Sequence, residues 1–129
     1  EMIPLCENRG VALIPWSPLA GGRVTRPWGT QTKRSQIDGV SPLVWGATEA
    51  ADKVEVDNLE KIAQHKGVSM AQVALAWQFS KPFITAPIVG TTAINHIEDA
   101  VAALDLSLSP EELAALEAPY IPHAVLSVF

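Results

Sequence analysis

The first stretch that suggests chemistry is the loop segment "SPLAGG", from Ser17 to Gly22. Ser17 offers a hydroxyl group, and Pro18 stiffens the turn. Gly21 and Gly22 allow a ligand to approach the backbone without a Cβ in the way. A basic cluster accompanies this loop in a stretch without acidic residues, and its members are Arg23, Arg26, Lys33 and Arg34. The segment is a candidate anion site, and a solvated basic loop is the alternative.

A second loop segment, "GTTAINHIED" from Gly90 to Asp99, has a similar character. Gly90 permits a sharp exit from the preceding element. Thr91 or Thr92 can cap a helix whose first-turn N–H groups would face an anion. Either loop alone is a common structural device. Together they favour a nucleotide, whose separated phosphates would occupy both loops.

Two apolar runs must position these loops. Val11 to Trp16 is a short continuous apolar run between a glycine and a Ser-Pro turn, which is typical of a parallel strand buried on both faces. Phe83 to Val89 predicts a second strand. Because the carboxyl ends of parallel strands meet at one edge of a sheet, both loops would lie on the same face.

The remaining chain alternates helices with these strands. A first helix is expected over Glu1 to Asn8 and a second over Asp52 to Lys66, which Gly10 and Gly67 would close as C-caps. Ser69 can cap a third helix, which stops before Pro82 and whose apolar positions are Met70, Val73, Ala74 and Trp77.

Two further helices follow the second strand. The spacing of Ile94, Ile97, Val101 and Leu104 predicts an amphipathic helix. Ser109, Pro110 and Glu112 then form a capping box with proline at the first helical position, and these three residues are followed by a last helix. The order of elements is that of βα units, interrupted by a long excursion from Ser17 to Ala51.

Composition narrows the class of protein. The 129 residues are expected to form a single segment, and the formal net charge of −5 argues against general nucleic-acid binding. With 48% hydrophobic residues but no apolar run of spanning length, a soluble cytoplasmic protein without membrane contact is expected. One cysteine and three separated histidines provide no ligand set for a metal.

Four segments together carry a family resemblance: "GVALIPWSPLAGGRVTR", "GVSMAQVALAWQFSKP", "APIVGTTAINHIEDAVAAL" and "LSPEELAALEAPYIPH". In combination and order they resemble the C-terminal part of the aldo-keto reductases, almost from end to end of this chain. The resemblance implies an α/β fold, namely part of a TIM (β/α)8 barrel. It also implies an oxidoreductase that reduces carbonyl compounds by hydride transfer from NADP(H), with NAD as the alternative cofactor.

The resemblance also assigns cofactor-binding residues. Trp16 matches the aromatic residue that stacks on the nicotinamide ring, with a core tryptophan as the alternative. Ser17, Leu19 and Gly21 match the loop at the pyrophosphate, and Arg34 or Lys33 resembles a basic contact further along. The segment at the adenosine 2′-phosphate and adenine is matched by Gly90, Thr91, Thr92, His96 and Asp99.

At three positions the chain departs from the family pattern. Gly90 stands where Lys is frequent, His96 where Arg is frequent, and Ala100 where Asn is frequent. The phosphate clamp is therefore lighter, because neutral threonine donors do not supply the charge that selects a 2′-phosphate. The loop cations Arg23, Arg26, Lys33 or Arg34 would have to supply it.

The family's catalytic Asp, Tyr, Lys and His belong to the first half of the barrel, and no residue of this chain matches them. Tyr120 matches a terminal "PY" segment and His123 is expected at the surface. We therefore expect no catalytic residue, and no turnover by the chain alone. Two parallel strands also cannot close a barrel, so a homo-oligomer is expected if the chain is complete. Two alternatives are a non-catalytic nucleotide-binding module and an oligomeric interaction module derived from the reductase fold.

Overall fold

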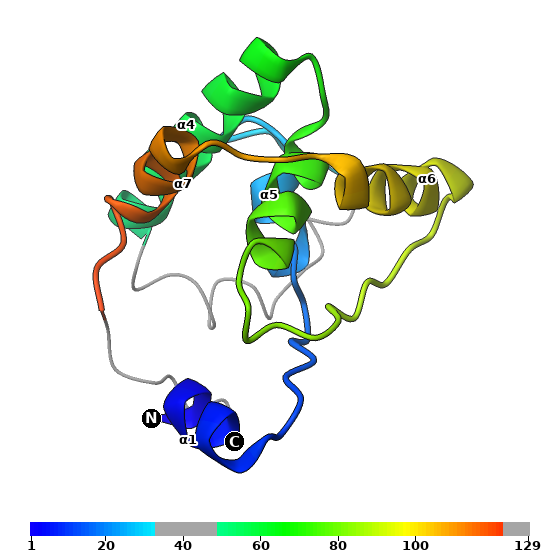
Figure 1. The fold of residues 1–129 in the computed structure, drawn as a ribbon. Coiled ribbons are helices and arrows are strands. Elements are labelled where there is room, and N and C mark those ends of the chain that lie inside the picture. Colours follow the sequence, from blue (N-terminus) through cyan, green and yellow to red (C-terminus); the bar gives the residue numbers. More distant parts are fainter. Residues whose placement is uncertain (33–48, 123–129) are drawn as a thin grey trace.

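The computed structural model describes residues 1–32 and 49–122. Lys33, Arg34 and His123, all considered above, lie outside these ranges. Along the chain the described elements are α1 (Met2–Arg9), η1 (Ala20–Thr25), α4 (Glu49–Lys66), α5 (Met70–Phe79), α6 (Ile94–Ala102), η3 (Ala103–Asp105) and α7 (Pro110–Glu117). Figure 1 shows α4, α5, α6 and α7 gathered in one region, with α1 apart from them.

The core forms where α4 packs against α5. Its buried side chains, all apolar, are Val56, Leu59, Ile62, Ala63, Met70, Val73 and Ala74. The C-terminal end of α4 and the start of α5 are as the sequence predicts, whereas α4 begins at Glu49, before the predicted Asp52. Gly67 adopts φ 67° after α4, and a complete capping box joins Ser69 to Gln72 at the start of α5. Trp77, expected in the core, is only half-buried, and its indole Nε1 donates a hydrogen bond to Glu117 Oε1 at 2.9 Å.

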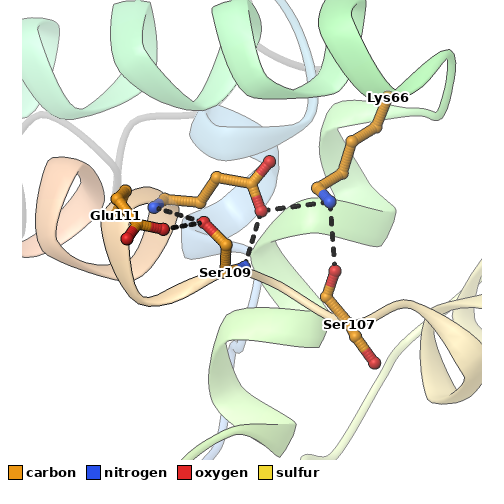
Figure 2. A network of polar contacts seen from close by, with 5 residues as sticks. Lys66, Ser107, Ser109 and Glu111 are labelled. Atoms are coloured by element: carbon orange, nitrogen blue, oxygen red, sulfur yellow. Dashed lines mark hydrogen bonds and ion pairs between the residues drawn. The ribbon is translucent and has the colours of Figure 1, made fainter.

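The last helix, α7, is attached to α4 by polar contacts. The predicted capping box is present, since Ser109 Oγ accepts from the Glu112 backbone N–H at 3.2 Å. Lys66 Nζ at the end of α4 pairs with Glu112 Oε2 at 3.0 Å and donates to the Ser107 carbonyl at 3.1 Å. Figure 2 shows this network between the two helices. The cap residues thus also fix where α7 lies on α4.

The two predicted strands are only partly formed. Parallel bridges join Leu13 to Ile84 and Trp16 to Ile88, but the described residues contain no extended ladder. The prediction that these strands are buried is wrong, because the exposed fractions of Ile14 and Ile88 are 58% and 49%. The described part of the chain places no further strand beside this pair, so its apolar side chains have no sheet or helix layer to pack against.

The amphipathic helix predicted from Ile94 onward forms, but its apolar stripe is not buried. The stripe residues Ile94, Ile97 and Val101 of α6 are 77%, 52% and 59% exposed, and Leu104 in η3, which continues the stripe, is 64% exposed. Ala103 at the end of the helix is instead the buried contact. The periodicity therefore identified the helix correctly, whereas the surface that would cover this stripe is absent from the described residues.

The described residues contain no helix that is both long enough and apolar enough to span a bilayer.

Candidate functional site

The two predicted loops line a single pocket of about 780 Å³. The parallel bridges place their starting points side by side, because Thr85 N–H donates to the Leu13 carbonyl at 2.8 Å and Ile88 N–H to the Pro15 carbonyl at 3.0 Å. The sequence-predicted residues that line the pocket are Trp16, Ser17, Leu19, Gly21, Gly90, Thr91, Thr92, His96 and Asp99. Arg34, the remaining predicted contact, lies outside the described residues. That these residues bind a cofactor stays a prediction.

The first loop, Ser17 to Gly22, is a tight turn in an unusual backbone conformation. Ser17 and Ala20 have φ values of 54° and 48°, and Gly21 and Gly22 have 64° and 96°. Left-handed φ values are costly for residues with a Cβ, so the surrounding contacts must hold Ser17 and Ala20 in place. Backbone hydrogen bonds close the turn, from Ala20 N–H to the Ser17 carbonyl at 2.9 Å and from Gly22 N–H to the Leu19 carbonyl at 2.7 Å.

Glycine is required at position 22 for a second reason, besides its φ value. A Cβ on Gly22 would lie 2.4 Å from the Nη2 atom of Arg26. The guanidinium of Arg26 therefore packs against bare backbone, and both residues line the pocket. The sequence offered several cations for an anion, and among the described residues Arg26 is the one that lines this pocket.

Arg23, the other described cation of the basic cluster, is engaged elsewhere. Its Nη2 atom lies 3.6 Å from Asp52 Oδ2, and its guanidinium carbon lies 4.9 Å from the ring centroid of Trp28. These contacts attach η1 to the start of α4. Arg23 therefore has a structural position, and it is absent from the pocket lining.

The second loop reaches α6 without the threonine cap that the sequence predicts. Ala93 is the N-cap of α6, and no side chain accepts a hydrogen bond there. The prediction that Thr91 or Thr92 caps this helix is therefore wrong. Both hydroxyl-bearing residues instead line the pocket, next to first-turn N–H groups that no protein side chain caps. Such a helix N-terminus is suited to an anion.

Gly90 is not required by the backbone. Its φ value is not in the left-handed region, and a Cβ built there meets nothing within 4 Å. Glycine is therefore not needed for the backbone conformation here, and a side chain fits at this position.

Two residues of α5 that the sequence analysis passed over contact the pocket loops. Gln72 Nε2 donates to Asp99 Oδ1 at 3.1 Å, and Gln78 Nε2 donates to the Pro18 carbonyl at 2.7 Å. The spacing of Ser69 and Gln72 signals a cap but not the contact with Asp99. Gln78, a polar residue on an apolar helix, was the available signal for a buried hydrogen bond.

Trp16 lies at the pocket and is 82% exposed. The alternative of a core tryptophan is therefore wrong. An aromatic face open to the pocket can stack on a planar ring.

The pocket has the size and the polar groups of a small-molecule site. Its volume is within the usual range for small-molecule sites, and hydroxyl groups, one guanidinium and an exposed indole converge on it. The Thr25 hydroxyl is already used, because it donates to the Gly22 carbonyl at 2.8 Å. Within residues 1–32 and 49–122, no group of three or more His, Cys, Asp or Glu side chains is arranged to hold a metal ion.

Comparison with known proteins agrees with the resemblance found in the sequence. The family model of the aldo/keto reductase family matches residues 1–121. Versiconal hemiacetal acetate reductase of Aspergillus parasiticus is 47% identical over 127 residues, which are 97% of this chain and 37% of that protein. A protein of Schizosaccharomyces pombe that is provisionally named an aryl-alcohol dehydrogenase is 43% identical over 126 residues, 95% of this chain and 34% of its own length.

A solved structure shares the fold. It is a thermostable aldo-keto reductase in complex with the inhibitor epalrestat, and it matches with a TM-score of 0.59 and 23% sequence identity. The match covers 92% of this chain and 33% of that structure. The chain thus spans about a third of the length of the proteins it matches. The family match over residues 1–121 shows that this chain belongs to the aldo/keto reductase family.

Proposed function

We propose that this chain forms the nucleotide-holding part of an NAD(P)H-dependent carbonyl reductase, with NADP as the preferred cofactor. The observation that carries the proposal is that the loops at Ser17 and Gly90 line one pocket. The names of the two relatives, a reductase and a dehydrogenase, support an oxidoreductase. When bound, the nicotinamide cofactor would supply the hydride, and the residues described here would hold and orient it.

The charges around the pocket indicate how a nucleotide would lie. Arg26 and the Ser17 hydroxyl would contact phosphate at the first loop, where positive charge is available. Asp99 would repel a phosphate, and its carboxylate would instead accept from an amino group of the base. Trp16, which also lines the pocket, would lie against the nicotinamide ring.

The bridged segments around Leu13 and Ile84 would be neighbouring strands of a (β/α)8 barrel whose other strands lie outside this chain. A barrel requires eight strands, and the fold shared with a third of an aldo-keto reductase structure supports this reading. No residue of this chain is proposed as the proton donor. Tyr120 is 60% exposed and does not line the pocket, which supports leaving it without a catalytic role.

A binding experiment tests the nucleotide proposal. NADPH is titrated into the 129-residue chain while tryptophan fluorescence is recorded, and Trp16→Phe shows how much of the signal comes from the pocket. Replacing Arg26 with Gln is expected to weaken NADPH binding about tenfold, since it removes a charge-assisted contact worth roughly 1.4 kcal/mol. Arg9→Gln, on exposed α1, is the matched control and should bind as the wild type does. Absence of binding up to millimolar NADPH would overturn the proposal.

An activity measurement separates this proposal from a non-catalytic nucleotide module. The chain alone, saturated with NADPH, is expected not to reduce a reactive aldehyde such as nitrobenzaldehyde, because it supplies no proton donor. Adding the remaining two-thirds of a related reductase should restore turnover if the chain is part of an enzyme. Binding without restored turnover favours the non-catalytic module, and turnover by the chain alone contradicts our assignment of roles.

A second candidate, an oligomeric interaction module, is favoured by one observation. The apolar stripe of α6 at Ile94, Ile97, Val101 and Leu104 is open to solvent in the described structure. Such a stripe is typical of a surface that another protein surface covers.

A further inference from the structure

Helix α5 lies between the two loops of the pocket and contacts each through one glutamine. Gln72 lies in its first turn and Gln78 near its last residue, Phe79. Figure 1 shows α5 beside the segment of η1 and close to α6. The helix belongs to the buried core, so side chains that extend from it are fixed to the most rigid part of the molecule.

Gln72 makes two contacts with different functions. Its Oε1 atom accepts from the Ser69 backbone N–H at 3.0 Å, which completes the capping box. Its Nε2 atom donates to Asp99 Oδ1 at 3.1 Å. Glutamate would serve the capping box as well as glutamine does. Only the amide of glutamine can also donate to a carboxylate, so the contact with Asp99 explains why an uncharged residue stands here.

Gln78 makes a comparable contact at the other end of α5. It is the buried polar side chain of this helix, with an exposed fraction of 6%, and its Nε2 atom donates to the Pro18 carbonyl at 2.7 Å. A buried amide without a partner is costly, so the loss of this contact would be unfavourable. Pro18 adjoins Ser17, whose left-handed backbone must be held by its surroundings.

We propose that Gln72 and Gln78 are positioning residues that set the two walls of the pocket independently of each other. Gln72 fixes the Asp99 wall and Gln78 fixes the Ser17–Gly22 wall. This inference rests on the proposed function, because the value of fixed walls depends on a ligand that contacts both. It further implies that each glutamine controls the binding of one half of a dinucleotide.

Two substitutions test the inference in the complete chain. Gln72→Glu keeps the capping box but replaces the donor to Asp99 with a second carboxylate. It should weaken binding of 2′,5′-ADP about tenfold and leave binding of reduced nicotinamide mononucleotide within twofold. Gln78→Leu keeps an apolar side chain in the buried position but removes the donor to Pro18. It should weaken binding of reduced nicotinamide mononucleotide about tenfold and leave binding of 2′,5′-ADP within twofold.

The control variants are Gln64→Glu and Gln64→Leu, since Gln64 lies exposed on α4 and its Nε2 atom donates to Glu60 Oε1 of the same helix at 3.0 Å. Hydrogen exchange of the ligand-free chain is the second measurement. Gln78→Leu should accelerate exchange of the Ala20 and Gly22 amides, while Gln72→Glu should leave these two unchanged. A substitution that merely destabilised α5 would accelerate amide exchange in both walls and weaken the binding of both fragments.

The outcomes separate the inference from the proposed function. If the wild-type chain binds neither NADPH nor its fragments, the proposed function fails, and this inference, which rests on it, fails with it. If the wild type binds them but both substitutions weaken the two fragments equally, or neither weakens any, only the positioning roles are overturned. If each substitution weakens the binding of a different fragment and amide exchange changes as expected, the positioning roles and the proposed function are both supported.

Discussion

At the residue scale, two cations that the sequence does not distinguish make different contacts in the structure. Arg23 and Arg26 are three positions apart in the same basic stretch, yet Arg23 pairs with Asp52 and Trp28 while Arg26 lines the pocket. The difference arises from Gly22, whose missing side chain leaves the space in which the Arg26 guanidinium lies. Among the described cations, Arg26 is therefore the one placed to contact a phosphate of the cofactor.

A single substitution at Gly90 should shift the preference between NADP and NAD. The backbone there accepts a side chain and the space is open, so Gly90→Lys should leave the thermal midpoint nearly unchanged. Its ammonium group would supply the charge that the threonines lack, and we expect about tenfold tighter NADPH binding, roughly 1.4 kcal/mol. NADH, which has no 2′-phosphate, serves as the control ligand. Equal gains for both cofactors, or none for NADPH, would contradict the assignment of this loop.

At the element scale, the helix ends were the features best predicted from sequence. Local rules decide a cap, because the partners lie within three residues, as at Ser69 and Ser109. The N-terminus of α6 shows the limit of such rules. Two threonines precede it, yet Ala93 is the cap and the threonines line the pocket. The loop at Ser17, which lines the same pocket, is distant from them in sequence.

The same reasoning explains the errors about burial. The run Val11 to Trp16 and the stripe of α6 have the patterns of buried elements, but burial requires a partner surface, and the described chain supplies none. The contacts of Gln72 and Gln78 were also beyond prediction, because the partners of a long polar side chain depend on tertiary packing. The helices and the pairing of the two loops were predictable, whereas extended strands, layers and side-chain partners were not.

The cap of α7 gives a stability prediction. Removing the Ser109 hydroxyl by Ser109→Ala should lower the free energy of unfolding by about 1 kcal/mol, because the Glu112 N–H loses its acceptor. Ser107→Ala is the matched control, since Ser107 uses its backbone carbonyl, not its hydroxyl, to bind Lys66. Chemical denaturation of both variants measures the difference. A loss at Ser107 as large as that at Ser109 would contradict the role of the cap.

The contact of α7 with α5 should depend on pH. The hydrogen bond from Lys81, and then that from Trp77, lowers the pKa of Glu117 below its usual range. A carboxyl group whose pKa is lower in the folded state adds stability above its unfolded pKa of about 4.3 and loses it as the pH falls through the folded value. The stability of the wild type relative to Glu117→Gln should therefore be larger at pH 7 than at pH 3, although exposure keeps it small.

The free energy of unfolding is compared between two variants, because the titration of Glu55 changes it with pH in the opposite direction. Burial, and then the neighbouring Asp52, raises the pKa of Glu55, so its protonation favours the folded state as the pH falls. Both chains share that contribution, and it cancels in the difference. Glu7→Gln on exposed α1 provides the control. An advantage of the wild type over Glu117→Gln that is constant from pH 7 to pH 3 would exclude the ion pair as its source.

At the scale of the whole molecule, the described chain has a pocket wall but lacks a cover for its apolar surfaces. The strand segment at Ile14, the bridge residue Ile88 and the stripe of α6 are all open to solvent. Burying one such aliphatic side chain completely gains roughly 1.5–3 kcal/mol. Because the chain spans about a third of the proteins it matches, the rest of a reductase barrel would cover these surfaces, and an isolated chain has only copies of itself.

The isolated chain should therefore self-associate through α6. In sedimentation equilibrium its average mass should exceed 13.8 kDa and rise with concentration. Val101→Lys places a charge in the middle of the stripe near the helix C-terminus, where a cation suits the helix dipole, so the helix should persist while association weakens at least tenfold. Val54→Lys on α4, where Val54 is 48% exposed, is the matched control and should associate as the wild type does. A wild-type chain that stays monomeric throughout would show that α6 is not a self-association surface, and equal losses in both variants would point to charge instead of the stripe.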